Sequence, residues 1–318
     1  MESRDNMINT PILFIIFNRP ETTALVFNQI KKIKPKKLYV VADAPRSNNT
    51  SDIENCRKAK EIIENIDWDC EVKKKYAKSN LGCGINVSEG ISWLFQQEEM
   101  AIILEDDCLP ATCFFEYCEK LLLKYKDDSR IMHIGGTNWH PNFNTRNHAS
   151  YFFSKHAHIW GWATWKRSWN LFDYKMSDFP EFIENKYYED VYDLKAEQSY
   201  FLLRWTSFFK SNYTNQSRSN WDYQWYYTVI KNNGLCIWPS TNLISNIGPI
   251  GTHSDNSEMS YYFRKVYENY KIEKHPDFVM PYRKLDNYHY WHHNHQSLYF
   301  RIKNKLFKII KNVFKFKS

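Results

Sequence analysis

Short apolar runs alternate with segments of helical period along the first 135 residues of the chain. This alternation predicts a parallel β-sheet whose strands are joined by crossover helices. Strands are predicted at residues 12–17, 38–42, 70–76 and 100–105, and helices at residues 21–33, 52–66, 86–97 and 111–125. Right-handed crossovers bring the loops after the strands to one edge, where open α/β sheets bind their ligands.

Aromatic residues dominate the next part of the chain. Nine of the 12 tryptophans lie between Trp139 and Trp238, and no repeat or Gly/Ser linker separates this segment from the first half. We therefore expect one continuous domain built from two halves, residues 1–135 and 136–280. A C-terminal extension follows at residues 281–318.

The formal net charge of +7 belongs to the C-terminal tail. Residues 301–318 contain seven Lys or Arg residues and no Asp or Glu, so residues 1–300 are close to neutral. A neutral body argues against nucleic-acid binding. Six residues of 299–318 fall on one stripe of a predicted amphipathic helix, with lysines on much of its other face: Tyr299, Ile302, Leu306, Ile309, Ile310 and Val313. Such a basic helix suits an anionic membrane surface, and the alternative is a helix docked on the domain or on a partner.

The cysteine content and the N-terminal sequence indicate the cellular compartment of the protein. The seven cysteines are an odd number without a CxxC pair, which argues against a disulfide framework or a zinc ribbon and favours a reducing compartment. The first apolar run, at residues 12–17, is too short for a signal sequence or a membrane span. We therefore expect a cytosolic protein, held at the inner face of the cell membrane by its tail.

Three adjacent carboxylates, Glu105, Asp106 and Asp107, end the predicted strand in ILEDD. Carboxylates this close repel one another and need a cation or hydrogen-bond donors. Their hard oxygens suit Mn²⁺ or Mg²⁺, which bind through carboxylates together with the phosphates of a substrate. The alternative explanation is an acidic loop that caps the following helix.

Polar residues follow the other predicted strands as well. Asn18 and Arg19 follow the first strand in FNRP, where the guanidinium is able to pair with a phosphate. Asp43 follows the second strand in ADAPR, and Asn80 and Gly82 lie in the turn SNLGCG after the third. Each of these is typical of an ordinary cap or turn, but four polar strand ends at one edge indicate a binding site.

The ordered motifs FNRP, VADAPR, NLG and ILEDD resemble the nucleotide-sugar-binding half of a GT-A glycosyltransferase. The closer resemblance is to a bacterial haemolysin-like group of GT-A proteins, and the more distant one is to N-acetylglucosaminyltransferase I. HIWGWATWKRSW, WDYQWYYTVIKNNG and GTHS in the second half also resemble the bacterial group. The resemblance implies a Rossmann-like open mixed α/β sheet with helices on both faces, in which residues 136–280 bind the acceptor.

The same resemblance implies a UDP-sugar donor and a divalent metal ion. Arg19 and Asp43 would contact the uridine nucleotide, Asp106 its ribose, and Asp107 the metal. Glu105 would support the site or approach the donor sugar. Asn18, Asn80 and Gly82 are assigned to the same donor site.

One departure from the pattern concerns the phosphates. Relatives are expected to carry a basic residue just after the glycine turn, and Gly84 and Ile85 stand there in this chain. A second phosphate contact therefore has no assigned residue.

Asp222 is the candidate base for the acceptor hydroxyl. In SNWDYQW it lies among aromatic residues, whose burial of the carboxylate would raise its pKa. It also resembles the acidic position of the family's acceptor-side motif, and such a base implies inversion at the anomeric carbon. The alternative is that Asp222 caps a helix over residues 223–232.

His253 and a later histidine cluster offer weaker signals. His253, in GPIGTHS, resembles a late histidine that completes the metal or diphosphate site, although a lone loop histidine is more often merely exposed. The cluster from His289 to His295 contains no carboxylate or cysteine, so a polar aromatic linker is favoured over a metal site. We assign it no role.

The tryptophans between Ile159 and Trp169 have two interpretations. Trp160, Trp162 or Trp165 could stack on a sugar, or they could form core, because large aromatics dominate interior packing. We expect most of them in the core and one or two at the acceptor cleft.

The sequence therefore predicts a metal-dependent glycosyltransferase that moves a hexosyl or N-acetylhexosaminyl group from a UDP-sugar to a hydroxyl of a surface glycan. The acceptor would be capsule, lipopolysaccharide or another lipid-linked glycan. One alternative is a nucleotidyltransferase of sugar-nucleotide synthesis, but FNRPETT lacks its Gly-rich phosphate loop. Another is a non-catalytic protein that binds glycans or nucleotides.

Overall fold

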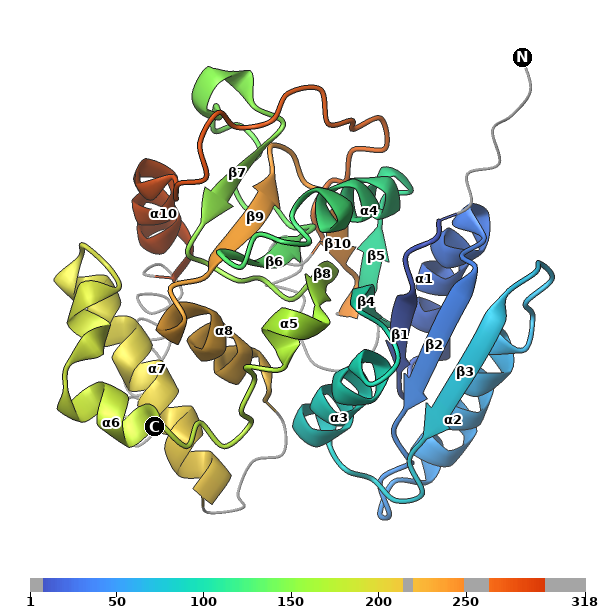
Figure 1. The fold of residues 1–318 in the computed structure, drawn as a ribbon. Helices are drawn as coiled ribbons and strands as arrows, with labels where there is room; N and C mark the ends of the chain where they lie inside the picture. The colour runs from blue at the N-terminus through green and yellow to red at the C-terminus, as the bar shows by residue number, and fades with distance from the viewer. Residues whose placement is uncertain (1–7, 214–219, 249–262, 295–318) are drawn as a thin grey trace, which may run out of the picture.

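The computed structural model describes residues 8–213, 220–248 and 263–294, which form an α/β fold (Figure 1). The described strands are β1 (Ile12–Ile16), β2 (Lys37–Ala42), β3 (Glu71–Tyr76), β4 (Met100–Glu105), β5 (Cys108–Pro110), β6 (Ile131–Gly135), β7 (Tyr151–Ser154), β8 (Trp162–Trp165), β9 (Leu235–Pro239) and β10 (Ile244–Asn246). The helices are α1 (Pro20–Ile33), α2 (Thr50–Ile63), α3 (Cys83–Phe95), α4 (Cys113–Lys124), α5 (Lys166–Trp169), α6 (Phe179–Glu184), α7 (Lys195–Tyr213), α8 (Asp222–Lys231) and α10 (Arg283–His289). Short helical turns lie at η1 (Arg146–His148), η2 (Tyr187–Asp190) and η5 (Tyr290–Asn294).

The main sheet of the described chain has eight strands in the order β3-β2-β1-β4-β8-β6-β9-β7. The four strands from β3 to β4 are parallel. β8 runs antiparallel to both of its neighbours, β4 and β6, whereas β9 is parallel to β6 and β7 is antiparallel to β9. A separate ribbon pairs β10 with β5 in antiparallel register.

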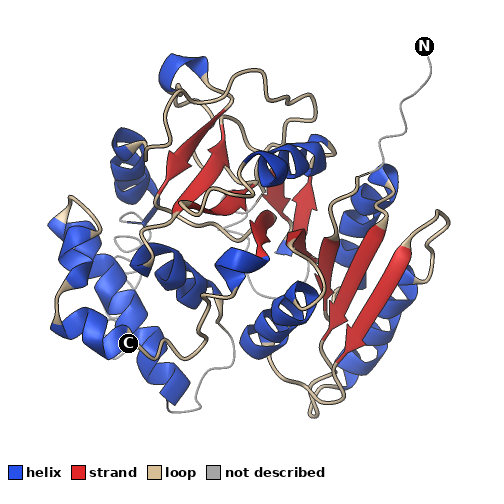
Figure 2. Ribbon diagram, in the orientation of Figure 1, coloured by secondary structure: helices blue, strands red, loops and turns tan. Residues whose placement is uncertain are grey.

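Both faces of this sheet are covered by helices (Figure 2). Successive side chains of a strand point to opposite faces, and every residue of β1 is buried. Ile12, Phe14 and Ile16 therefore join the core beneath α1, α2 and α4. Leu13 and Ile15 join a second core beneath α3 and α8. This two-sided burial explains the continuous apolar run of the first strand.

A third core holds the helices of the second half together. It gathers aromatic side chains of α6, α7 and α8, including Phe182, Phe201, Trp205 and Tyr226. In Figure 1, these helices lie apart from the β1–β3 end of the main sheet. Some of the aromatic residues of the second half thus build a helical layer, whereas most of its tryptophans join the core beneath α3 and α8.

The predicted fold class is confirmed by this topology. Each strand and helix predicted within residues 1–135 is present, with bounds within three residues of those expected. The predicted amphipathic helix at residues 299–318 lies outside the described residues. Within the described ranges, no helix is both long enough and apolar enough to cross a membrane.

Candidate functional site

A cavity of about 490 Å³, here called the first cavity, lies where β1, β2 and β4 end. Its wall brings together seven residues that the sequence assigns to donor binding or catalysis: Asn18, Arg19, Asp43, Asn80, Gly82, Glu105 and Asp106. Arg46, Cys83 and Asn86 line it as well, and none of the three is predicted from the sequence as a site residue. The polar residues that follow the parallel strands therefore lie at one edge of the sheet, as the order of the strands along the chain predicts.

Arg19 is the cation that two of the strand-end carboxylates share. Its Nη1 donates a hydrogen bond to Asp107 Oδ2 at 2.9 Å, and its Nη2 donates one to Asp106 Oδ1 at 2.5 Å. The backbone N–H of Phe17 donates to the other oxygen of Asp106 at 3.0 Å. Burial alone would lower the pKa of Arg19, but the two carboxylates more than reverse this effect.

Glu105 is the carboxylate of the triplet that carries the largest pKa shift. Burial, followed by repulsion from Asp107, raises the pKa of Glu105 to about 8. Burial also raises the pKa of Asp106 to about 6, although Arg19 opposes the rise. Perturbed carboxylates at a cavity wall are typical of functional sites. The cluster therefore has an affinity for positive charge that Arg19 satisfies in part.

Asp43 holds the loops after β2 and β3 together. Its Oδ1 accepts hydrogen bonds from the backbone N–H groups of Ala44 and Leu81, at 2.8 and 2.9 Å. Its Oδ2 accepts from Gly82 N at 2.9 Å and from Asn80 Nδ2 at 3.2 Å. Gly82 has a φ of 81°, a conformation that favours glycine and lets the backbone turn into α3.

Asn18 and Arg46 are linked through Asp52, a residue that the sequence analysis did not single out. Asn18 Nδ2 donates to Asp52 Oδ1 at 2.7 Å, and Arg46 donates to both Asp52 oxygens at 2.6 and 2.9 Å. Hydrogen bonds from Arg46 hold the pKa of Asp52 at about 2. Arg46 belongs to the ADAPR motif. Its position after the second predicted strand could have identified it as a site residue.

The ribbon of β5 and β10 brings a distant glycine against Asp107. Asn246 pairs with Cys108, and Ile247 N donates to the carbonyl oxygen of Asp107 at 2.7 Å. A Cβ added at Gly248 would lie 2.8 Å from Asp107 Oδ2 and 3.2 Å from an Arg19 nitrogen. A larger residue here would therefore displace the Asp107 carboxylate or the Arg19 guanidinium. His253 follows in segment 249–262, which lies outside the described residues.

The donor set at this edge fits a hard divalent cation, because it consists of carboxylate oxygens. Asp107 Oδ1 has the Cys108 thiol as a weak donor at 3.4 Å, which leaves this oxygen available to a metal ion. Across the described ranges, no three His, Cys, Asp or Glu side chains converge closely enough to hold a metal by themselves. A metal ion bound here would complete its coordination with water or with oxygens of a substrate.

Asp222 is the first residue of α8 and lies on the wall of a second cavity of about 190 Å³. Burial raises the pKa of Asp222, although backbone N–H groups at the start of the helix oppose the rise. Repulsion from Asp222 also contributes to the raised pKa of Glu105, which lines the first cavity. Asp222 therefore acts electrostatically on one cavity while it lines the other, in addition to beginning its helix.

The second cavity is walled by aromatic rings and histidines. Its lining residues include Trp139, Trp160, Tyr200, Phe201, Tyr223, His156, His158, His289 and His293. Trp162 and Trp165 are instead buried in the cores, at 1% and 2% exposure. Of Trp160, Trp162 and Trp165, Trp160 is thus the one that lines the second cavity.

The preference for a linker at the histidine cluster is wrong. His289 is fully buried at the end of α10, and its ring nitrogens lie 3.2 Å from His140 Nε2 and from His158 Nε2. Burial lowers the pKa of His289 and of His158 well below the usual value, and that of His293 to about 3. The partners come from distant segments, which local sequence cannot show.

Comparisons with known proteins find only distant likenesses. No family model matches the chain, and neither does any curated protein. A mannosyltransferase from Pyrobaculum calidifontis, in complex with GDP-Man and Mn²⁺, is similar over 52% of this chain and 46% of its own, with 12% identity and a TM-score of 0.35. This chain thus spans less than half of that enzyme.

An apo UDP-glucose pyrophosphorylase is similar over 76% of this chain and 94% of its own, with 9% identity and a TM-score of 0.37. A 4-diphosphocytidyl-2C-methyl-D-erythritol synthase from Anaerococcus prevotii covers 51% of this chain and 74% of its own, with 10% identity and a TM-score of 0.31. Likenesses at this level establish no activity, so function is inferred from the site itself.

Proposed function

We propose that this protein is a metal-dependent glycosyltransferase that moves a sugar from a UDP-sugar to a hydroxyl group of a surface glycan. The observation that carries the proposal is the position of Asp222. It lines the second cavity, and its charge adds a small contribution to the raised pKa of Glu105 at the wall of the first, after burial and the charges of Asp107, Arg19 and Asp106. A donor in the first cavity and an acceptor in the second would meet beside this carboxylate.

The first cavity, together with Asp107 outside its lining, supplies the groups that a departing nucleoside diphosphate needs. Arg19 offers a guanidinium at the end of β1, where it is able to pair with phosphate oxygens. Asp107 would hold Mn²⁺ or Mg²⁺ through its carboxylate, with His253 as the second proposed ligand. The metal ion would neutralise the charge that develops on the diphosphate. Asp43, Asn80 and Gly82 would form the turn that faces the nucleotide.

Asp222 would act as the general base. As the acceptor oxygen attacks the anomeric carbon, the bond from that carbon to the diphosphate oxygen breaks and UDP leaves. The proton of the acceptor hydroxyl passes to the Asp222 carboxylate. A single displacement of this kind inverts the anomeric carbon.

The second cavity favours a neutral acceptor sugar. Its histidines His158, His289 and His293 have lowered pKa values, so they are uncharged near neutral pH. Trp139 and Trp160 add aromatic surface on which a sugar ring is able to pack. His156 on the same wall is the exception, because burial lowers its pKa less than the pairing with Glu197 raises it. The wall otherwise offers hydrogen bonds and stacking from neutral imidazoles and aromatic rings.

The decisive experiment measures UDP release from a panel of UDP-sugars, with Mn²⁺ and with EDTA. Wild type is compared with Asp107→Ala, Asp222→Ala and the control Asp127→Ala, whose carboxylate is 89% exposed on the surface. We expect metal-dependent hydrolysis of one donor, lost in the first two variants and kept in the control. If UDP does not bind to the wild type, the proposal is wrong.

The same assay, with pyrophosphate added, distinguishes a glycosyltransferase from a nucleotidyltransferase. A nucleotidyltransferase would convert a UDP-sugar and pyrophosphate to UTP and a sugar phosphate. The chain passes from β1 into α1 through FNRP without a glycine, and Arg19 occupies the position before the helix. We therefore expect no UTP formation. UDP binding without turnover of any donor would favour a non-catalytic role.

We also infer that residues 299–318 hold the protein at the cytosolic face of an anionic membrane. The support is the run of seven cations without a carboxylate in residues 301–318. Vesicle sedimentation tests this inference. Binding should require anionic lipid, weaken with salt and fall when Lys303, Lys305 and Lys308 are replaced by Glu.

A further inference from the structure

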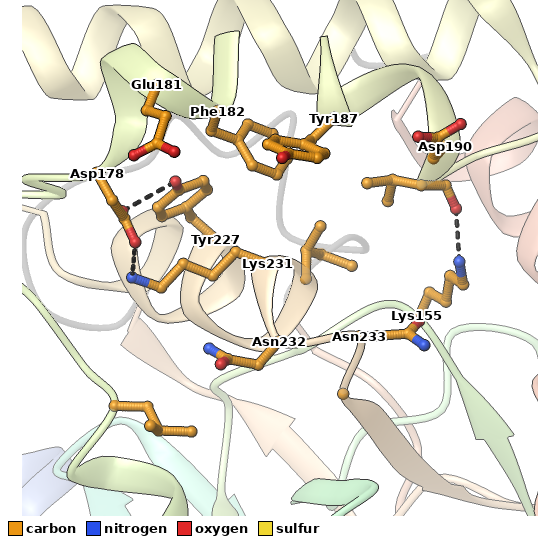
Figure 3. A pocket seen from close by; sticks show the side chains of 14 residues that line it. Lys155, Asp178, Glu181, Phe182, Tyr187, Asp190, Tyr227, Lys231, Asn232 and Asn233 are labelled. Atoms are coloured by element: carbon orange, nitrogen blue, oxygen red, sulfur yellow. Dashed lines mark hydrogen bonds and ion pairs between the residues drawn. The ribbon is translucent and has the colours of Figure 1, made fainter. Parts of the chain in front are cut away.

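A third cavity, of about 630 Å³, lies among the helices of the second half (Figure 3). It is lined by residues of α6, of η2, of the end of α8 and by Lys155 after β7. None of its lining residues belongs to the first or the second cavity. Its volume is within the usual range for small-molecule sites. It is therefore a separate candidate site.

The two lysines of the cavity already have partners. Lys231 Nζ lies 2.6 Å from Asp178 Oδ2, and Tyr227 OH donates to Asp178 Oδ1 at 3.0 Å. Lys155 Nζ donates to the carbonyl oxygen of Val191 at 2.6 Å. Figure 3 shows both interactions at the cavity wall. With one lysine neutralised and the other used by the backbone, this cavity is poorly suited to a phosphate or a nucleotide.

Several other polar groups remain available to a ligand. Glu181 and Asp190 are exposed, and neither carboxylate has a hydrogen-bond partner among the residues that the structure describes. Asn232 donates from Nδ2 to the carbonyl oxygen of Thr228 at 2.8 Å, which leaves its side-chain oxygen as an acceptor. Asn233 adds a second amide at the turn that ends α8. The wall therefore offers both hydrogen-bond donors and acceptors.

Aromatic surface completes the wall. Tyr187 is 52% exposed, and its ring centre lies 6.0 Å from that of buried Phe182. In Figure 3, Phe182 and Tyr187 come from the side opposite Asn232 and Asn233. A flat ligand is therefore able to pack on Tyr187 while its edges reach amides and carboxylates.

From these features we propose that the third cavity binds a neutral carbohydrate, as a saccharide site separate from the reacting centre. Hydroxyl groups donate and accept hydrogen bonds, which matches the carboxylates and amides, and the C–H face of a sugar packs on an aromatic ring. Carboxylates and amides interrupt the apolar surface of the wall, which makes it a poor site for an acyl chain. With both lysines engaged, the free carboxylates of Glu181 and Asp190 would repel an anion. The site does not depend on the proposed transfer activity.

The position of the cavity connects it to the candidate base. α8 begins at Asp222 and ends at Lys231, which lines the third cavity. At the rise of an α-helix, the two Cα atoms are about 14 Å apart. A saccharide held here would keep a glycan near the protein without occupying the second cavity.

The test measures binding of a panel of neutral oligosaccharides built from glucose, galactose, mannose and N-acetylhexosamines. Saturation-transfer NMR and calorimetry on the full chain, with UDP present, compare wild type with Tyr187→Ala, Tyr187→Phe and Asp222→Ala. Tyr267→Ala, at another exposed tyrosine outside the three cavities, is the matched control. Donor hydrolysis and UDP binding are measured on the same variants.

We expect at least one oligosaccharide to bind, with affinity reduced about tenfold in Tyr187→Ala, which corresponds to about 1.4 kcal/mol. Tyr187→Phe, Asp222→Ala and Tyr267→Ala should keep the affinity, and Tyr187→Ala should keep UDP binding. The proposal is overturned if no saccharide binds, if Tyr187→Ala binds normally, or if Asp222→Ala alone abolishes binding. Saccharide binding by a protein that hydrolyses no donor would sink the transferase proposal and leave this one standing.

Discussion

Arg19 Nη1 donates a hydrogen bond to Asp107 Oδ2 across 2.9 Å, so a side chain that follows β1 neutralises a carboxylate that follows β4. The same guanidinium reaches Asp106, and Gly248 packs against both partners of the first contact. Arg19 thus supplies the positive charge that balances the Asp106 and Asp107 carboxylates. Substrate phosphates and a metal ion would compete with these contacts when they bind.

We predict that Arg19→Met lowers the free energy of unfolding by about 2 to 3 kcal/mol, because it leaves two carboxylates without their shared cation. Millimolar Mn²⁺ should restore part of this stability, and more than it adds to the wild type, because the freed oxygens then bind the metal. Urea unfolding with and without Mn²⁺ measures both effects.

Arg57→Met is the control for that experiment. Arg57 is 53% exposed and pairs with surface carboxylates, so its loss should cost much less stability than the loss of Arg19 and create no response to Mn²⁺. Equal stabilisation of all three proteins by Mn²⁺ would contradict the prediction.

Asp43 supports a second prediction, because four hydrogen bonds converge on its carboxylate. In Asp43→Asn, an amide nitrogen replaces an oxygen that accepts two of them. We expect a loss of about 2 to 3 kcal/mol in the free energy of unfolding, together with weaker UDP binding as the Gly82 turn loosens. Urea unfolding measures the stability and calorimetry measures the affinity for UDP, with Asp127→Asn as the exposed control. Unchanged stability would mean that the carboxylate does not organise the turn.

Gly248 and Gly90 form a matched pair for a third prediction. A Cβ at Gly248 would lie 2.8 Å from Asp107 Oδ2, whereas a Cβ at Gly90 would lie 2.9 Å from side-chain atoms of buried Val41. Gly248→Ala should weaken UDP binding severalfold with little loss of stability. Gly90→Ala should cost about 1 to 3 kcal/mol of stability by overpacking, with UDP binding kept in the folded protein. The reverse pattern would show that Gly248 serves packing alone.

Asp222 sets the expected pH dependence of activity. Burial raises its pKa above the usual 3.8, so the carboxylate takes up a proton at a higher pH than a free aspartate does. A general base works in its deprotonated form, so kcat/KM should fall as the pH drops, with a midpoint above 3.8. Asp222→Asn should lose about 10² to 10⁴-fold in rate. An Asp222→Asn enzyme with an unchanged profile would exclude the base role.

Sequence periodicity predicted the four parallel strands and four helices of the first half and the edge that carries the candidate site, but not the short strands β5 and β6. The reason is physical, because buried parallel strands need continuous apolar runs and their carboxyl ends meet at one edge. The order of strands and polar residues along the chain is therefore sufficient to bring Asn18, Asp43 and Glu105 to a common edge. Their chemical roles remain predictions.

Contacts between distant segments could not be predicted in this way. Gly248 reaches Asp107 only through the register of β10 on β5, and no local pattern encodes that register. The buried contacts of His289 with His140 and His158 likewise depend on how α10 packs. Asp52 looked like an ordinary residue at the start of a helix, although its carboxylate joins Asn18 to Arg46.

The reversed strand β8 has a consequence for fragments of this protein. β8 pairs with β4 on one side and β6 on the other, so residues 162–165 join strands that come much earlier in the chain. A polypeptide cut after residue 135 would keep β6 but lose both strands that pair with it in the described sheet, β8 and β9. It would also expose one edge of β4, and bare edges of this kind recruit other chains. Expression of the first half alone should therefore yield aggregates instead of a portable nucleotide-binding module.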